Sequence, residues 1–441
     1  MGPWNEARIP VISARDFALA ELDAKRLPGW PSDLLRARGT APSSNPPADP
    51  RDRALGEQII TGVTKHLLYL QWLTAHFAQR SLRRIDPIAQ KVLAIGIYQL
   101  RFLSRVPSSA VVDEAVKQAK RVGHAHAAGF INAVLRKATR ESDPPPPERV
   151  VDPAGYAEAI LSHPADLFAR LVNLLGPVDA LRFCEHDDLE PPVIVRVYQG
   201  VTANDLACEG VNVAPHEQPG LYVVSPGRAP VLADWAERGI AQAQDPTPAA
   251  VVGHMQIEAQ HTVLDRCCGF GTKTFQIQEL LTSGHIVAMD PSENRLRALR
   301  HLLERRHIKN VSVHKIGMME QLPSSQIRTF DRILADVPCS NSGVLARRPE
   351  ARYAQDDKSI ASVMKLQDRI FEDCASALKP GGRLVYSTCS VWPDENEMRV
   401  AQFIQRHPEY QLVSEVRTLP SFDVDPARYH DGGYYAVLTR G

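Results

Sequence analysis

The sequence of 441 residues has no uninterrupted apolar stretch near the roughly 20 residues that a membrane-spanning helix needs. Its first residues, MGPWNEARIPVISARD, lack the basic start, apolar run and small-residue cleavage site of a secretory signal. The seven cysteines include no CxxC pair, so neither a disulfide framework nor a recognisable zinc site is indicated. These absences lead us to expect a cytoplasmic protein with reduced thiols, no membrane association and no bound metal.

The chain also lacks net charge, because 51 Lys and Arg balance 51 Asp and Glu. This balance is uneven along the sequence. Residues 51–140 carry 15 basic against 5 acidic side chains, whereas residues 141–441 carry 30 against 40. A basic segment is therefore joined to an acidic one, which is compatible with a polyanionic partner and equally with an Arg-rich helical surface.

Two Pro-rich stretches, residues 39–50 and 142–147, bracket the basic segment. Between them apolar residues recur at helical spacing in LGEQIITGVTKHLLYLQWLTAHF, IAQKVLAIGIYQLRFL, VVDEAVKQAKRV and AAGFINAVLRKAT. The earlier stretch ARDFALAELDAKRL has the same spacing and is a predicted first helix. We therefore expect an all-helical domain over residues 1–141, with residues 39–50 as a loop.

After the basic segment, the sequence pattern changes from helices alone to a mixture of helices and strands. Residues 148–255 combine an amphipathic helix in PADLFARLVNLLG with the strand-like PPVIVRVYQ and LYVVSP, which predicts a connecting α+β subdomain. Further on, apolar strands alternate with amphipathic helices; the strand candidates are TVLDRC, HIVAMD, VSVHKIG, DRILADVP and GGRLVYSTC. Such alternation is typical of a parallel doubly wound sheet, so residues 256–441 are predicted to form an α/β Rossmann-like domain.

A loop with two glycines follows the first of these strands and precedes a helical segment, FQIQELL. Glycines at this point let backbone N–H groups approach a ligand closely. A tight strand-to-helix turn is the alternative interpretation. The candidate ligand-binding residues of this loop are Cys267, Cys268, Gly269, Phe270, Gly271, Thr272 and Lys273.

The second strand ends at Asp290, where a carboxylate can accept hydrogen bonds from ribose hydroxyls. Asp290 follows Gly271 by 19 residues, close to the spacing of about 20 that is typical of nucleoside binding in such folds. Because Pro291-Ser292-Glu293 follow, Asp290 is also a candidate helix cap. Together the loop and Asp290 suggest a nucleoside cofactor.

Two cysteines follow neighbouring strands at the edge of the sheet where ligands bind. The fourth strand leads into Asp336 and Cys339, and the fifth leads into Cys389. A paired-thiol redox site is one interpretation of this arrangement. The cysteines elsewhere are expected to act as small buried hydrophobic residues, namely Cys184, Cys208 and Cys374.

These segments resemble the RsmB/Sun group of bacterial 16S ribosomal RNA cytosine-C5 methyltransferases over nearly the full length of the chain. DRCCGFGTKT resembles the S-adenosylmethionine-binding loop of this family, ADVPCSNSGVLARRPEARY its fourth motif and YSTCSVWPDENE its sixth. The basic segment resembles the NusB-like RNA-binding domain of the group, LSHPADLFARL and GIAQAQDPTPAAVV its connecting region, and DGGYYAVLTR its closing strand. The resemblance implies S-adenosylmethionine as cofactor and RNA, in particular 16S ribosomal RNA, as partner.

The sequence departs from the family pattern at two points. The family loop usually reads Ala-Ala-Pro-Gly-Gly-Lys, whereas this chain has Cys268-Gly269-Phe270-Gly271-Thr272-Lys273, which keeps the lysine and moves the glycines. The third motif usually offers an aspartate near the adenine. The matching stretch KIGMMEQLP has Met318 at that position, with Glu320 nearby.

The resemblance also implies roles for individual residues. Cys389 is the implied nucleophile that adds to C6 of the cytosine, and Cys339 the group that assists release. Asp336 is expected to hydrogen-bond the cytosine edge or its protonated N3, beside the cofactor. Lys273 is expected to favour the charged sulfur or to contact the substrate, or else to be solvent-exposed. A cluster of arginines is expected to contact the RNA backbone or to form a solvated turn: Arg347, Arg348 and Arg352.

The sequence leaves other functions open. A transfer RNA substrate is the alternative within the enzyme class, because the NusB-like domain argues for ribosomal RNA by analogy only. A non-catalytic RNA-binding assembly factor is the alternative outside it, suggested by the altered loop and Met318. We expect a monomer.

Overall fold

The computed structural model describes residues 13–25, 27–30, 45–225 and 229–441, without the side chains of Cys208, Ala229 and Pro230. The chain divides into two compact units, Met1–Asp188 and Leu189–Gly441. Within the described ranges, none of the helices combines the length and apolar character of a membrane span.

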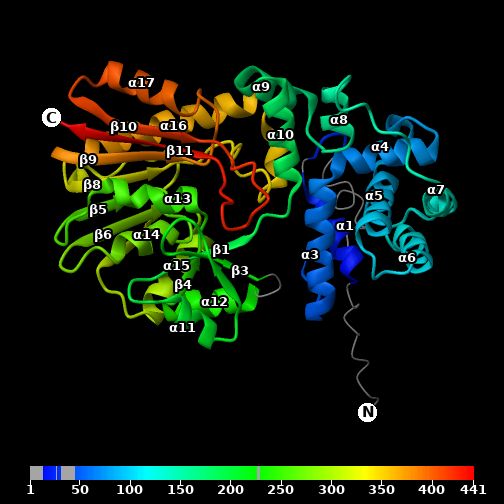
Figure 1. Cartoon of the computed structure of the whole chain (residues 1–441), viewed down its shortest axis with the longest axis horizontal. Coiled ribbons are helices and arrows are strands. Elements are labelled where there is room, and N and C mark those ends of the chain that lie inside the picture. Colours follow the sequence, from blue (N-terminus) through cyan, green and yellow to red (C-terminus); the bar gives the residue numbers. More distant parts are fainter. Residues whose placement is uncertain (1–12, 26, 31–44, 226–228) are drawn as a thin grey trace, which may run out of the picture. The chain divides into compact units, whose positions relative to one another are not determined.

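The first unit is helical throughout its described part, as predicted (Figure 1). Helix α5 forms its centre, because residues 88–99 are all buried. The apolar stretch over residues 55–77 is divided between two helices that meet at His66, where the backbone leaves helical geometry. The helices are α1 (Ala14–Ala24), α3 (Pro50–Lys65), α4 (Leu67–Ala78), α5 (Pro87–Phe102), α6 (Ser108–Arg121) and α7 (Ala128–Arg140). Residues 45–49 form a loop before α3, and residues 39–44 lie outside the described part.

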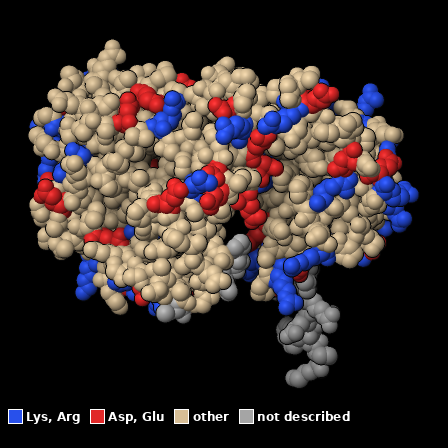
Figure 2. Space-filling view, viewed as in Figure 1, with Lys and Arg blue, Asp and Glu red and all other residues tan. Residues whose placement is uncertain are grey.

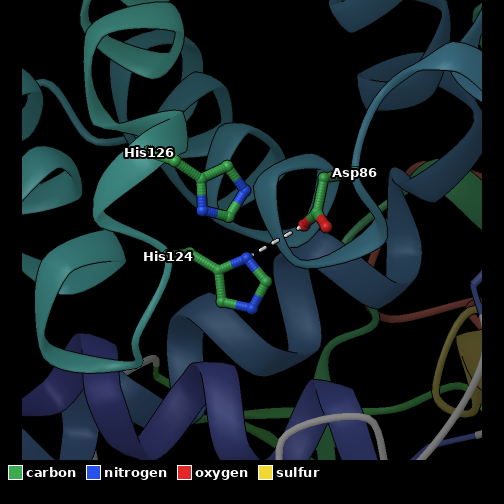
Figure 3. Close-up of side chains that lie close together, drawn as sticks. All are labelled: Asp86, His124 and His126. Atoms are coloured by element: carbon green, nitrogen blue, oxygen red, sulfur yellow. Dashed lines mark ion pairs between the residues drawn. The ribbon is translucent and has the colours of Figure 1, made fainter.

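Asp86 caps the start of α5. Its Oδ1 accepts hydrogen bonds from the backbone N–H groups of Ile88 at 2.9 Å and Ala89 at 3.0 Å. The buried His124, in the link between α6 and α7, places Nδ1 3.3 Å from the same oxygen. The exposed His126 points toward both side chains (Figure 3). This contact holds the α6–α7 link against the start of α5.

Basic side chains are exposed on α6 and α7. Figure 2 shows Lys and Arg gathered where these two helices lie. Some have acidic neighbours on the same helix; Lys117, for example, lies 3.2 Å from Asp113. We call this set the basic helical surface: Lys117, Lys120, Arg121, Arg136 and Arg140.

The predicted connecting subdomain, residues 148–255, is divided between the two units. Its helices α8 (Pro153–Ala159), α9 (Ala165–Leu175) and α10 (Pro177–Asp188) belong to the first unit. Hydrogen bonds attach them there, from the Tyr69 N–H to Ser162 Oγ at 3.1 Å and from Lys65 Nζ to the Asp188 carbonyl at 2.6 Å. The division follows from these contacts, which sequence periodicity does not reveal.

The remainder of that segment opens the second unit with a small antiparallel sheet of order β2-β3-β1-β4. Trp235 of α12 (Ala229–Arg238) is fully buried against this sheet. Arg196 of β1 bonds Glu279 at 2.7 Å, which ties the small sheet to the end of the helix over residues 272–278. Its strands are β1 (Val193–Val197), β2 (Val213–Pro215), β3 (Leu221–Val224) and β4 (Ala241–Ala243), and α11 (Ala203–Cys208) follows β1.

The larger sheet has seven strands in the order β10-β11-β9-β8-β5-β6-β7. The five predicted strands are present and parallel: β5 (Thr262–Asp265), β6 (His285–Asp290), β7 (Val311–Lys315), β8 (Phe330–Asp336) and β9 (Leu378–Thr388). Two further strands extend this sheet: β11 (Gly433–Arg440), which contains the expected closing strand, is antiparallel to both of its neighbours, β9 and β10 (Tyr410–Thr418). A loop without a helix joins β10 to β11, so nothing carries the chain back for a parallel strand.

Helices cover both faces of this sheet, as expected for a doubly wound fold (Figure 1). The apolar core on one face is closed by α16 (Asp357–Ala377) and α17 (Glu397–Arg406), through Phe371 and Phe403. The core on the other face is closed by the 3₁₀ helix η3 (Val251–Met255), which follows α13 (Pro246–Ala250), and by α14 (Thr272–Gln278) and α15 (Glu293–Arg305). The carboxyl ends of the parallel strands stay open to loops, and the predicted site residues lie there.

Candidate active site

Two cavities open where the loops after β5, β6, β8 and β9 meet. The larger cavity has a volume of about 650 Å³ and the smaller cavity about 440 Å³. They adjoin, because seven residues line both: Pro248, Lys273, Asp336, Val337, Asn341, Arg348 and Cys389. Three of these are predicted catalytic residues, so the structure brings them together at the junction of the cavities.

The glycine loop forms one wall of the smaller cavity. Gly271 has φ +89°, and a Cβ there would lie 2.4 Å from Leu299 Cδ1, so this position requires glycine. Gly269 has φ +57°, and its N–H donates to Asp290 Oδ2 at 3.1 Å. The loop and α14 thus form the tight turn of the alternative interpretation and also line a cavity. The predicted residues that line it are Cys267, Cys268, Gly269, Phe270, Thr272, Lys273, Asp290, Met318 and Asp336.

Asp290 connects two turns at the wall of this cavity. Besides accepting the Gly269 N–H, it accepts the Ser292 N–H through Oδ1 at 2.8 Å. Ser292, rather than Asp290, is the residue that precedes α15. Each carboxylate oxygen has two lone pairs, so Asp290 keeps capacity to accept a further hydrogen bond from a ligand.

Asp265, at the end of β5, is a cavity residue that was absent from the predicted set. Its carboxyl group is 1% exposed, and Oδ2 accepts a hydrogen bond from Thr274 Oγ1 at 2.6 Å. Oδ1 has no hydrogen-bond partner among the described residues, although it is buried. Burial raises the pKa of Asp265 to about 7. An unpartnered buried acceptor in a cavity wall fits a ligand that brings a donor or a positive charge; the sequence signal was a carboxylate directly before the glycine loop.

Lys273 and Asp336 form an ion pair at the junction of the cavities. Lys273 Nζ donates to Asp336 Oδ2 at 2.6 Å, and Ser387 Oγ donates to Asp336 Oδ1 at 2.6 Å. Burial disfavours the Lys273 ammonium, but Asp336, Asp265 and the Cys389 sulfur favour it by more, so its pKa is raised. The Lys273 side chain is only 13% exposed, which excludes the solvent-exposed alternative.

The two thiols lie side by side at the same junction. Cys339 Sγ and Cys389 Sγ are 2.9 Å apart. Asn341 connects both loops, because its Oδ1 accepts from Cys389 Sγ at 3.1 Å and its Nδ2 donates to the Cys339 carbonyl at 3.1 Å. The hydrogen bond to Cys389, and then burial, raise the pKa of Cys339 well above its usual value. Cys339 therefore holds its proton strongly.

Asn341 has φ +60°, a left-handed conformation that asparagine tolerates better than most residues. It was not predicted, because its contacts depend on how two loops meet. The larger cavity is also lined by His216, Thr247 and His430, which lie outside the motifs of the cofactor loop and the two cysteines. Of these, Thr247 lies within GIAQAQDPTPAAVV, so its resemblance to the connecting region of the family was the available signal.

The three arginines predicted to contact RNA have different environments. Arg352 is fully buried, so the expectation of a backbone contact or a solvated turn is wrong for it. Arg347 bonds Asp431 at 2.6 Å and Asp245 at 3.2 Å, so its charge is already compensated. Arg348 is exposed, lines both cavities and has no ion pair among the described residues. It is the arginine that remains available to a ligand.

The other residues discussed in the sequence analysis lie either in the wall of the smaller cavity or in the protein core. Met318 lines the smaller cavity, whereas the Glu320 carboxylate turns back to accept the Gly317 N–H at 2.7 Å. Burial raises the pKa values of Cys267 and Cys268. Cys184 and Cys374 are buried, as expected, and the Cys208 side chain lies outside the described residues.

One group among the described residues could hold a metal ion, although the sequence indicated no metal. It is the Asp86, His124 and His126 cluster of the first unit, whose ligand atoms lie within 4.8 Å of one another. The hydrogen bonds of Asp86 at the start of α5 already account for the position of its carboxylate.

Comparison with known proteins gives two family matches. The family 16S rRNA methyltransferase RsmB/F matches residues 253–429, and the NusB family matches residues 17–140. The ribosomal RNA small subunit methyltransferase B of Vibrio cholerae is 31% identical over 90% of this chain and 92% of its own length. The protein of the same name from Pectobacterium carotovorum is 31% identical over 88% and 91%.

Solved structures share the fold. The protein PH0851 has a TM-score of 0.77 with 21% identity and covers 98% of both chains. A methyltransferase homolog from Pyrococcus horikoshii has a TM-score of 0.53 with 23% identity and covers 65% of this chain and 98% of its own. Together with the family matches and the relatives at 31% identity, these findings confirm the resemblance: the chain belongs to the RsmB/F family of 16S rRNA methyltransferases and carries a NusB-family domain.

Proposed function

We propose that the protein transfers a methyl group from S-adenosylmethionine to C5 of a cytosine in 16S ribosomal RNA, through a covalent bond between Cys389 and C6. The observation that carries this proposal is the pair of thiols, 2.9 Å apart, where the two cavities meet. The relatives at 31% identity are named ribosomal RNA small subunit methyltransferases, which favours this substrate over transfer RNA. The basic helical surface would add sequence-independent affinity for RNA.

The smaller cavity fits the cofactor through its hydrogen-bond acceptors. Asp265 offers the unpartnered Oδ1 to a positively charged or hydroxyl donor, and Asp290 keeps acceptor capacity for ribose hydroxyls. Met318 offers an apolar contact in place of the aspartate usual in the family. Bound there, S-adenosylmethionine supplies an electrophilic methyl group beside the thiols.

The nucleophilic step needs Cys389 as a thiolate, which forms when Cys389 loses its proton to water. Cys339 then donates its S–H to the Cys389 sulfur, and the Lys273 ammonium compensates nearby negative charge. Addition of the sulfur to C6 breaks the aromatic system and moves electron density to C5, which takes the methyl group. Asp336 can accept a hydrogen bond from the cytosine amine or from a protonated N3, which stabilises the ring during addition.

Release regenerates the aromatic ring. The C5 proton passes to the Cys339 sulfur, the C5–H electron pair forms the C5–C6 double bond, and the C6–sulfur bond breaks with its pair returning to Cys389. Cys339 must first lose its own proton to water. Its bond to Cys389 is the main cause of its raised pKa, and that bond weakens once the Cys389 sulfur is a neutral thioether. Formation of the adduct thereby makes it easier for Cys339 to lose its proton and then accept the C5 proton.

Methyl transfer from labelled S-adenosylmethionine to small-subunit ribosomal RNA tests this function, with wild type, Cys389→Ala and Cys339→Ala compared. We expect wild type to methylate, Cys389→Ala to be inactive, and Cys339→Ala to accumulate a covalent RNA complex that survives denaturing electrophoresis. Methylation by Cys389→Ala would refute the nucleophile assignment. No S-adenosylmethionine binding in calorimetry would favour the non-catalytic alternative, and methylation mapping in a deletion strain would identify a transfer RNA substrate.

A further inference from the structure

The buried carboxylate of Glu395 lies between the two thiol loops. Glu395 is fully buried and precedes α17. Its Oε2 accepts hydrogen bonds from the Ser340 backbone N–H at 2.9 Å and from Gln367 Nε2 at 2.9 Å. Its Oε1 accepts from Ser390 Oγ at 2.7 Å. A single carboxylate thus bonds the residue that follows each of the two cysteines.

Further hydrogen bonds hold the loop that carries Cys339. Gln367 Nε2 also donates to the Pro338 carbonyl at 3.0 Å. Gln355 Nε2 donates to the Ser340 carbonyl at 2.9 Å, while its Oε1 accepts from Trp392 Nε1 at 2.8 Å. Neutral amides make these bonds, whereas the bond from the Ser340 N–H ends on the Glu395 carboxylate. Charge-assisted hydrogen bonds are about twice as strong as neutral ones.

Cys389 is anchored in a different way. It directly follows β9, whose last residue, Thr388, is paired with Tyr434 of β11. The Cys389 carbonyl also accepts the Gly343 N–H at 2.9 Å. The sheet therefore positions Cys389, whereas Cys339 lies in a loop without regular structure and depends on side-chain hydrogen bonds.

We propose that Glu395 is a positioning residue for the release step, because it fixes the Cys339 thiol against Cys389 through the Ser340 N–H. This inference rests on the proposed function. Loss of the Glu395 carboxylate removes the partner of the Ser390 hydroxyl, but β11 and Gly343 still anchor the backbone at Cys389. The loop that carries the release group is freed. The enzyme then forms the adduct and transfers the methyl group, but resolves the adduct slowly. The negative charge of Glu395 acts in the same direction as burial and the Cys389 bond in keeping Cys339 protonated before the adduct forms.

The test compares Glu395→Ala and Glu395→Gln with wild type and Cys339→Ala. Labelled S-adenosylmethionine and small-subunit ribosomal RNA give two readouts, the turnover and the fraction of enzyme in covalent RNA complex. Asp331→Asn is the matched control, because Asp331 also accepts a backbone N–H and pairs with Lys379 at 2.7 Å, but lies at the start of β8, away from the thiols. Thermal melting reports the stability of every variant.

For Glu395→Ala we expect turnover to fall about tenfold or more, because the loop of Cys339 loses the charge-assisted hydrogen bond at Ser340, while the complexed fraction rises toward that of Cys339→Ala. Glu395→Gln should recover most of the turnover, because its amide oxygen still accepts the Ser340 N–H. Asp331→Asn should change neither readout beyond its loss of folded protein. If Glu395→Ala does not fold, Gln367→Leu decides, because it removes the bonds to both Pro338 and Glu395 and should trap the complex in the same way.

A purely structural role predicts a different result, in which turnover and covalent complex fall together in Glu395→Ala. That outcome, or wild-type values for both, overturns the inference. Failure of the proposed function is separate: wild type would then transfer no methyl group, or Cys339→Ala would trap no complex.

Discussion

The two cavities that meet at the thiols differ in charge. The smaller cavity is lined by as many carboxylates as cations, and its Asp265 and Asp290 are each 1% exposed. The larger cavity is lined by four Lys and Arg side chains and two histidines against two carboxylates, Glu217 and Asp336. Two of these arginines, Arg347 and Arg428, also pair with carboxylates beside the lining, whereas Arg348 has no ion pair among the described residues. Buried acceptors suit a small ligand with donors and positive charge, whereas an excess of cations suits a polyanion.

This difference explains how one sheet edge can serve two ligands of unlike charge. Under the proposed function, the cofactor brings a sulfonium and an ammonium group to the smaller cavity, and RNA brings phosphates to the larger one. Only the junction, with Lys273, Asp336 and Cys389, must accommodate both. Variants on either side should therefore separate cofactor affinity from RNA affinity, and variants at the junction should mainly affect turnover.

The largest effect is expected at the junction. Lys273→Met leaves the Asp336 carboxylate without its ion-pair partner and the thiols without a nearby cation, so kcat should fall about 10²–10³-fold. Lys379→Met is the matched control, because Lys379 also pairs with an aspartate, Asp331 at 2.7 Å, away from the cavities. Steady-state methyl transfer measures both. A wild-type kcat in Lys273→Met would remove Lys273 from the catalytic set.

A smaller effect, on cofactor affinity, is expected from Asp265→Asn. The pKa of Asp265 is raised to about 7, and a positively charged ligand favours its ionised form. Wild-type affinity for S-adenosylmethionine should therefore strengthen as pH rises from 6 to 8, with release of a proton. Asp265→Asn should bind about tenfold more weakly at pH 8 and lose this pH dependence, which calorimetry measures. Parallel pH profiles for the two proteins would contradict the assignment.

The same variant has a second readout in the absence of cofactor. Because the folded pKa of Asp265 lies above its unfolded value of 3.8, the folded state holds the proton more tightly. This carboxyl group therefore contributes stability below about pH 4, and that contribution is lost as pH rises to about 7. Thermal melting at pH 8 should accordingly show Asp265→Asn to be more stable than wild type. A lower melting temperature would indicate that the ionised form is well solvated.

The smallest effect is expected from Arg348→Ala, at the exposed arginine. Loss of one phosphate contact should raise the KM for RNA by about threefold and reduce the slope of log affinity against log salt by about one. Arg297→Ala, at an exposed arginine of α15 that lines neither cavity, is the control. An unchanged salt slope in Arg348→Ala would show that Arg348 does not contact the RNA backbone.

The sequence predicted the parallel part of the sheet well, because β5, β6 and β8 each contain a short apolar run. It missed β10, whose residues 411–417 are all exposed and thus carry no strand-like alternation of apolar side chains. That strand exists because β11 offers it a pairing edge. Its formation is a tertiary effect that local patterns do not contain.

The site residues show the same contrast between what local patterns predict and what tertiary contacts determine. Cys339, Cys389 and Asp336 could be predicted, because residues at the ends of neighbouring parallel strands must lie close together. The contacts of Asn341 and the burial of Arg352 could not, because they depend on how the loops fold over one another. For Arg352, the cluster of arginines in the sequence suggested an exposed side chain, whereas the fold buries it.

The position of β11 within the sheet has a consequence for synthesis. β11 is the last strand of the described chain, yet it pairs with β9, which leads directly into Cys389. While a ribosome is still making the chain, β9 is paired with β8 on one side only, and the nucleophile that follows β9 lacks the support of β11. The thiol is therefore fully supported only after the segment 433–440 has emerged and docked, so a truncated product that carries every motif would lack one of the two strands beside its nucleophile.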